Sequence, residues 1–114
     1  MQYLLLIYED EKRWTDLNSP EAKALLGEYH AFSQECAPAI RGGNALQATG
    51  TAKSVRVRNG KPMVSDGPFA ETKEQLGGFY LVEAANADEA SAIAAKIPSA
   101  RFGTIEVRPI QKFS

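Results

Sequence analysis

Apolar residues gather in short runs along the chain, separated by polar and glycine-containing stretches. Residues 3–8 are apolar at every position, so a strand there would have two apolar faces and would need cover on both. Residues 79–82 form a second run of strand-forming residues, and residues 103–108 alternate, with Ile105 and Val107 inward. We therefore expect three strands at these positions.

Two further segments carry apolar residues at spacings of three and four, which predicts helices. Ser19 can cap the first and Pro20 suits its first position, and this helix is expected to run to about Ala37. Asn86, with Glu89 three positions later, predicts the start of the second. The expected inward residues are Ala22, Leu25, Leu26, Tyr29, Phe32 and Cys36 in the first helix and Ala90, Ile93, Ala94 and Ile97 in the second.

The clearest local signal is a β-hairpin over residues 54–64. Polar and apolar residues alternate over residues 54–58, Asn59-Gly60 is a preferred pair for a two-residue turn with positive φ, and residues 61–64 form the returning strand. We expect one apolar face and therefore a half-buried hairpin. The apolar face pairs Val55 with Val64 and Val57 with Pro62. Arg56 and Arg58 fall on the other face, which is interpreted as solvated, with an anion-binding patch as the alternative.

The order of these elements predicts an α+β fold. Residues 45–47, between Gly43 and Gly50, are expected to form one more short strand. The order is then strand, helix, short strand, hairpin, strand, helix, strand, which is the split βαβ, ferredoxin-like arrangement with an inserted hairpin. With 114 residues, 44% of them apolar, the chain is expected to form a single domain over residues 1–114.

Charge and composition exclude several classes of function. Thirteen basic residues against fourteen acidic ones, with no basic run, lack the footprint of a nucleic-acid-binding protein. The first apolar run is too short to span a membrane. Cys36 is the only cysteine, so no internal disulfide is possible, and we expect a cytoplasmic protein.

Residues 66–78 combine turn residues, charge and paired glycines, and are expected to form an ordered loop that leads into the strand at 79–82. Asp66 has two interpretations. As a turn residue it would accept a hydrogen bond from the backbone N–H of Phe69. As a candidate catalytic residue it would be a general base or ligand anchor, with Lys73 nearby to keep it ionised and a glutamate of the same loop as a second carboxylate.

The remaining candidates for chemistry are isolated residues. Cys36 lies on the inward helical stripe and is interpreted as an inert thiol. His30 is the only histidine, and we expect neither a metal nor another cofactor. Trp14 either fills the edge of the core or forms a pocket wall.

The run Asp66-Gly67-Pro68-Phe69, continued by Ala70-Glu71-Thr72-Lys73-Glu74, resembles the DGPF-motif proteins of the YCII-related family. The resemblance extends over nearly the whole chain, through residues 6–8, Trp14, the Asn59-Gly60 turn and residues 106–109. It implies the ferredoxin-like fold, assembled as a dimeric α+β barrel. Relatives are associated with a His and Asp pair, whereas here His30 stands outside any recognisable family motif. Family members are also often encoded beside, or fused to, extracytoplasmic-function sigma factors.

The sequence leaves the reaction, and whether there is one, open. We expect a homodimeric small-molecule-binding protein with a cleft near the motif loop. The candidate ligand-binding residues are Tyr8, Trp14, Asp66, Phe69, Lys73 and Tyr80. The alternatives are a regulatory partner of a sigma factor and a dimer without a ligand. The dimer is expected because two helices can cover only one face of the sheet, which leaves a second apolar face for a partner sheet.

Overall fold

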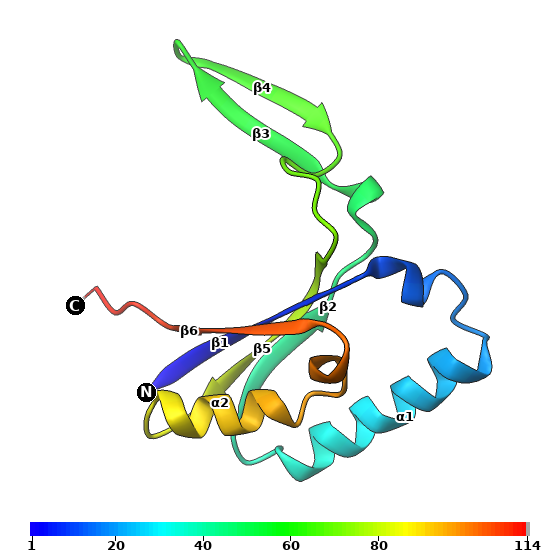
Figure 1. Cartoon of the computed structure of the whole chain (residues 1–114). Coiled ribbons are helices and arrows are strands. Elements are labelled where there is room, and N and C mark those ends of the chain that lie inside the picture. Colours follow the sequence, from blue (N-terminus) through cyan, green and yellow to red (C-terminus); the bar gives the residue numbers. More distant parts are fainter. Residues whose placement is uncertain (114) are drawn as a thin grey trace.

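The computed structural model describes residues 1–113, and over this range the chain forms a four-stranded sheet, a separate two-stranded hairpin and two α-helices (Figure 1). The strands are β1 (Gln2–Glu9), β2 (Ile40–Ala45), β3 (Lys53–Arg58), β4 (Lys61–Asp66), β5 (Gln75–Glu83) and β6 (Thr104–Pro109). The helices are α1 (Pro20–Glu35) and α2 (Ala87–Ala95), with short 3₁₀ turns η1 (Glu11–Trp14), η2 (Thr49–Thr51) and η3 (Pro98–Arg101).

The main sheet has the strand order β2-β5-β1-β6, and every neighbouring pair is antiparallel. β1, which is apolar over residues 3–8, therefore lies in the interior of the sheet, where strand pairing continues on both of its sides. Its central residue Leu5 pairs with Tyr80 of β5 and with Val107 of β6. The α+β class expected from the sequence is confirmed.

Both helices lie on one face of this sheet, and the hairpin rises on the other side (Figure 1). Tyr3, Leu5 and Ile7 of β1 point toward the helices and are buried in the core. The core also contains Phe32, Cys36, Val82, Ala84, Ala90, Ala94 and Ile97. Leu4, Leu6 and Tyr8 fall on the opposite face and are half-buried, which settles the parity that the sequence left open.

Each α-helix begins directly after a residue whose side chain caps it. The Ser19 hydroxyl accepts a hydrogen bond from the Ala22 N–H at 3.1 Å, and the Asn86 side chain accepts one from the Glu89 N–H at 2.9 Å. The first helix ends at Glu35, two residues before the expected end. Leu26, expected on the inward stripe, is exposed instead, because it faces a cavity that separates this part of α1 from the sheet.

The hairpin has the expected register and turn but not the expected burial. Val55 pairs with Val64 and Val57 with Pro62, and Asn59 and Gly60 have φ of 54° and 74°. Val55, Val57 and Val64 are 62%, 60% and 63% exposed, so the prediction of a half-buried hairpin is wrong. The hairpin forms a sheet of its own, and its apolar side is left largely exposed.

The short strand lies earlier than expected, at β2 rather than at residues 45–47. Gly43 allows a close approach of this strand to β5. A Cβ at Gly43 would come within 2.8 Å of the Phe79 carbonyl oxygen and 2.9 Å of the Tyr80 ring. Gly43 is therefore part of the strand, whereas the sequence interpretation used it as a boundary. None of the helices within residues 1–113 has the length and apolar character needed to cross a membrane.

Candidate functional site

A cavity of about 780 Å³ lies between α1 and the β2–β5 side of the sheet. Aromatic side chains from three elements contribute to its wall: Trp14 of η1, Tyr29 of α1 and Tyr80 of β5. The Trp14 and Tyr29 rings are 6.3 Å apart between centroids and tilted by 56°. Apolar side chains complete much of the lining, and they include Ile7, Leu17, Leu26 and Leu46.

Glu9, the last residue of β1, supplies a buried carboxylate to this cavity. Its exposed fraction is 4%. The Trp14 indole N–H donates to Glu9 Oε1 at 2.8 Å, whereas Oε2 is buried and accepts no hydrogen bond from any residue in the range 1–113. Buried carboxylate oxygens almost always have a donor, because burying an unpaired charge is costly. Glu9 Oε2 can therefore accept a hydrogen bond from a bound molecule.

The backbone around Glu9 is shaped by two glycines on neighbouring strands. The pairing of β1 with β5 shifts between Ile7 and Tyr8, where Gly77 is the extra residue. Such bulges re-aim side chains and are common beside functional sites. On the β6 side, a Cβ at Gly103 would lie 2.2 Å from the Tyr8 carbonyl oxygen and 2.9 Å from Glu9 Cβ. Only glycine permits this approach, which fixes the end of β1 against the start of β6.

Tyr29 is held in its neutral form. Burial raises the pKa of Tyr29 to about 12, against a hydrogen bond to Ser99 that lowers it, and the negative charge of Glu9 raises it further. The Tyr29 and Ser99 hydroxyl oxygens are 2.5 Å apart, and Ser99 is fully buried. The Tyr29 hydroxyl is thus engaged on the side of η3 and does not supply a donor to Glu9.

The mouth of the cavity is fastened by polar contacts and bordered by leucines. Both carboxylate oxygens of Glu11 accept hydrogen bonds from Thr49, from its N–H at 2.9 Å and its hydroxyl at 2.8 Å. This ties η1 to η2 across the opening. Leu17, Leu26 and Leu46 line the cavity and are exposed. Grouped exposed apolar side chains at an opening are typical of a binding site.

The residues predicted for the site do not form one cluster. Trp14 and Tyr80 line the cavity, whereas Tyr8 is on the opposite face of the sheet from Ile7. Asp66, Phe69 and Lys73 are exposed and do not line it. A role of these last three in ligand binding stays a prediction. His30, on α1, is exposed.

The contacts of Asp66 differ from both sequence interpretations. Its carboxylate pairs with Lys53, across the hairpin, rather than with Lys73. Within residues 1–113 no hydrogen bond joins it to the Phe69 N–H. The loop is held instead by backbone of Gly67, whose N–H donates to the Ala52 carbonyl at 2.7 Å and whose carbonyl accepts from the Ser54 hydroxyl at 2.8 Å. The motif thus fastens the base of the hairpin.

Sequence reasoning missed Glu9. The signal was present in the alternation of β1, because Tyr3, Leu5, Ile7 and Glu9 share one parity, and the first three are core residues. A charged residue at an inward position of a central strand is unusual. That parity could be used only once the inward face of β1 was known.

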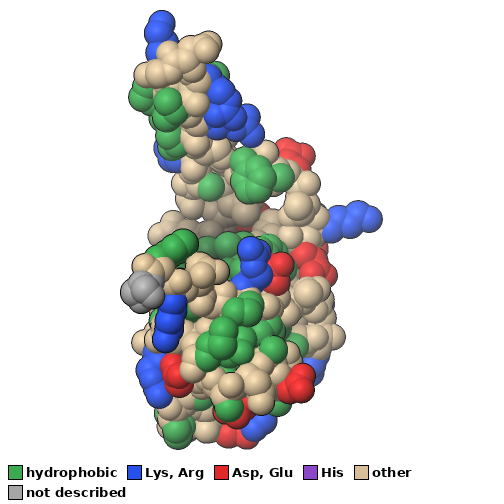
Figure 2. Space-filling view, turned by 90° about the vertical axis from the view of Figure 1, so that its left-hand side faces the viewer, with side chains coloured by type: hydrophobic (Ala, Val, Ile, Leu, Met, Phe, Trp, Pro, Cys, Tyr) green, Lys and Arg blue, Asp and Glu red, His purple; other side chains and the backbone are tan. Residues whose placement is uncertain are grey.

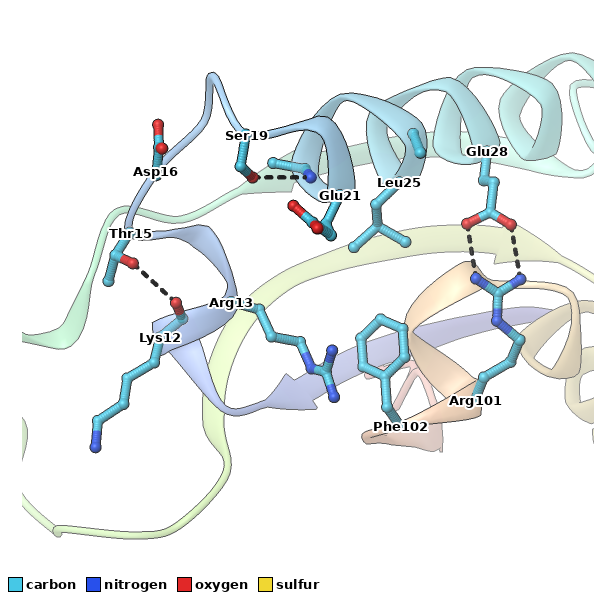
Figure 3. Close-up of a pocket in the computed structure, with 12 residues that line it drawn as sticks. Lys12, Arg13, Thr15, Asp16, Ser19, Glu21, Leu25, Glu28, Arg101 and Phe102 are labelled. Carbon is cyan, nitrogen blue, oxygen red and sulfur yellow. Dashed lines mark hydrogen bonds and ion pairs between the residues drawn. The ribbon is translucent and has the colours of Figure 1, made fainter.

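A second hollow, of about 470 Å³, lies at the N-terminal end of α1 (Figure 3). Its two arginines already have partners. Arg101 binds both carboxylate oxygens of Glu28, at 2.8 and 2.6 Å, and the Arg13 guanidinium lies 3.9 Å from the centroid of the Phe102 ring. These contacts join η1, α1 and η3, so this hollow is best explained as packing between elements.

Comparison with known proteins agrees with the whole-chain architecture. Residues 1–114 match the YCII-related domain. The chain belongs to the YCII-related family. This YCII-related chain is 35% identical to an uncharacterised protein of Rhizobium meliloti (strain 1021), over 96% of its own length and 92% of the relative's.

A solved structure shares the fold of this YCII-related protein. It is the 5-chloro-2-hydroxyhydroquinone dehydrochlorinase TftG from Burkholderia phenoliruptrix AC1100, in complex with 2,5-dihydroxybenzoquinone. The TM-score is 0.58 at 13% identity, and the match covers 97% of this chain and 94% of the other. At this identity the likeness concerns the fold alone.

Proposed function

We propose that this protein binds a small, largely apolar molecule in the cavity between α1 and the β2–β5 side of the sheet, with Glu9 as the polar anchor. The observation that carries the proposal is the buried Glu9 carboxylate, which lines the cavity and has one oxygen without a donor within residues 1–113. A ligand that donates a hydrogen bond there completes the site.

Size and lining support this proposal. Sites for small molecules are concave, mostly apolar and about 300 to 1,000 Å³, with a few polar groups that orient the ligand. The cavity, at about 780 Å³, falls in this range. The neighbour named as a dehydrochlorinase, in complex with a small ring compound, adds support because a protein of the same fold binds such a molecule. A catalytic step in the present protein is not part of the proposal.

The test uses Trp14, the only tryptophan, as a fluorescent reporter inside the cavity. Screening a metabolite library should find a compound that changes its emission and raises the melting temperature. A ligand at ~100 times its dissociation constant stabilises the fold by roughly 2.7 kcal/mol. Ala45→Leu fills the cavity from β2 and should abolish the response. Ala31→Leu, on an exposed position of α1 outside the cavity, is the control and should retain it.

We also propose that the protein is a homodimer, in which two ferredoxin-like sheets form an α+β barrel. The antiparallel order β2-β5-β1-β6 and the helices on one face support this arrangement. The opposite face carries half-buried apolar side chains that are aligned by strand register: Leu4, Leu6 and Tyr8 of β1 with Phe79 and Leu81 of β5. A partner sheet would cover them in a closed, twofold interface.

The hairpin supports the dimer independently. Hydrophobic side chains gather on one side of it and Lys and Arg on the other, above further hydrophobic side chains on the body (Figure 2). Residues 53–66 carry four basic side chains and one acidic one, a formal charge of +3, against nine basic and thirteen acidic side chains elsewhere, a charge of −4. The hairpin of one copy is thus complementary in charge to the body of another. An association with a sigma factor stays a separate proposal, to be tested by copurification.

A further inference from the structure

We propose that the occupant of the cavity is an organic cation: an ammonium group on an apolar body, with the ammonium at Glu9. This inference rests on the proposed function and adds the chemical class of the ligand. It follows from the charge, the aromatic wall and the apolar residues of the cavity.

The first argument is the charge of Glu9. Within residues 1–113 its carboxylate forms no ion pair, and its one donor is the neutral Trp14 indole. A hydrogen bond satisfies an oxygen but leaves the buried charge uncompensated, and buried charges are normally paired. The charged side chains that line the cavity are Glu9, Glu11 and Lys12, so the lining has a net formal charge of −1. A cationic ligand would neutralise it.

The side chains around Glu9 leave this position to the ligand. Lys12 is exposed and makes no ion pair with Glu9. The Tyr29 hydroxyl is engaged by Ser99. Glu11 accepts its hydrogen bonds from Thr49 and remains a second negative charge near the opening. An anionic ligand would meet two carboxylates and is therefore disfavoured.

The aromatic wall is the second argument. Trp14, Tyr29 and Tyr80 all line the cavity, and Trp14 also holds Glu9 through its indole N–H. The faces of such rings attract a cation, and Trp is the most effective of the three types. A carboxylate beside several aromatic rings is a combination that suits an ammonium group.

The other residues that line the cavity indicate the chemistry of the rest of the ligand. Much of the lining apart from Glu9, Glu11 and Lys12 is apolar, and it includes Leu17, Leu26 and Leu46. These leucines are exposed at the opening. A molecule that fits has a charged end held inside and a hydrocarbon or aromatic end directed to the leucines, where its burial is favourable.

A charge series of otherwise similar probes tests this assignment. 2-Phenylethylamine, 2-phenylethanol and phenylacetate are cationic, neutral and anionic at pH 7, and their binding to the full chain is measured by calorimetry and Trp14 fluorescence. We expect the amine to bind at least tenfold more tightly than the alcohol, and the carboxylate not to bind. Equal affinity of amine and alcohol, or binding of the carboxylate, would overturn the inference and leave the proposed function standing. Absence of binding by all three would overturn both.

The substitution Glu9→Gln tests whether the preference for a cationic ligand comes from the Glu9 carboxylate. This change keeps the shape and an acceptor for Trp14 but removes the charge, so the amine should lose at least tenfold in affinity while the alcohol is unchanged. Glu21→Gln makes the same charge change at an exposed residue that does not line this cavity, and should leave both affinities as they were. If Glu9→Gln retains full affinity for the amine, the anchor is elsewhere and the inference is wrong.

Discussion

At the scale of single residues, Glu9 is the side chain whose environment differs most from its ordinary preference. It is 4% exposed, has one hydrogen-bond donor and, within residues 1–113, no ion pair. Groups in this condition lower stability and are retained where they contribute to function. Removing the charge of Glu9 should therefore increase the stability of the fold and weaken ligand binding.

We predict that Glu9→Gln raises the melting temperature of the ligand-free protein. Removing a buried, uncompensated charge should gain about 1 kcal/mol, or roughly 4 °C in a domain of this size. Differential scanning calorimetry measures the change, with Glu21→Gln as the reference for an exposed site. A lower melting temperature would mean that the Glu9 carboxylate stabilises the fold.

Tyr29 should be visible in an alkaline titration. Its pKa of about 12 lies above the ordinary value of 10.0, so the folded state keeps this proton at pH values where the unfolded state has lost it. The stability that it contributes is complete below pH 10 and is lost as the pH rises from 10 to 12. Phenolate absorbance should show a late-ionising group, and Tyr29→Phe should remove it. A titration unchanged by this substitution would contradict the assignment.

At the scale of elements, helix starts and the hairpin turn could be predicted from sequence because the determinants are local. Ser19 and Asn86 cap their helices, and Asn59-Gly60 forms the turn. The hairpin's exposure could not be predicted, because alternation specifies an apolar side without saying what covers it. The β2 strand was misplaced because Gly43 is required by its contact with Phe79 and Tyr80 of β5, which are distant in sequence.

The candidate site was predicted only in part for the same reason. Trp14 and Tyr80 were among the candidate ligand-binding residues, and both line the cavity; a role in ligand binding stays a prediction. The position of the Glu9 side chain depends on the β1–β5 bulge and on the close approach of Gly103 to Tyr8 and Glu9. No local sequence pattern encodes either feature. Asp66 was predicted as a site residue because it belongs to the motif. Its carboxylate instead pairs with Lys53 at the base of the hairpin.

The ion pair of Asp66 at the base of the hairpin allows a test of whether the motif takes part in ligand binding. Asp66→Asn should leave the melting temperature within error, because exposed ion pairs such as that with Lys53 contribute little. Ligand binding in the cavity should also be unchanged, since Asp66 does not line it. Loss of binding with unchanged stability would show that the motif acts directly in recognition, and would require Asp66 to approach a ligand.

Cys36, the C-terminal cap of α1, should be a slow thiol. Burial raises its pKa, although the nearby Lys96 ammonium opposes this effect. Because the thiolate is the reactive form, a thiol reagent should modify Cys36 slowly in the native protein and rapidly in denaturant. Rapid labelling of the native protein would indicate that this end of the helix opens readily.

At the scale of the whole molecule, β1 is apolar on two faces but the chain covers only one. We predict that Leu4→Arg, on the face away from the helices, gives a folded monomer, whereas Leu5→Arg, on the core face, prevents folding. Sedimentation at low micromolar concentration and circular dichroism separate the two outcomes. A wild-type monomer would contradict the proposed dimer, and a folded Leu5→Arg variant would contradict the assignment of the faces.

The isolated hairpin described above has a consequence for solubility. A two-stranded ribbon has two unpaired edges, and unpaired edges are templates for the addition of further strands from other molecules. Pro62 removes one donor from β4, and Lys53, Arg56, Arg58 and Lys61 put like charges on every such ribbon. Ribbons of neighbouring molecules therefore repel one another, which works against continued strand addition and favours an assembly that stops at a finite size.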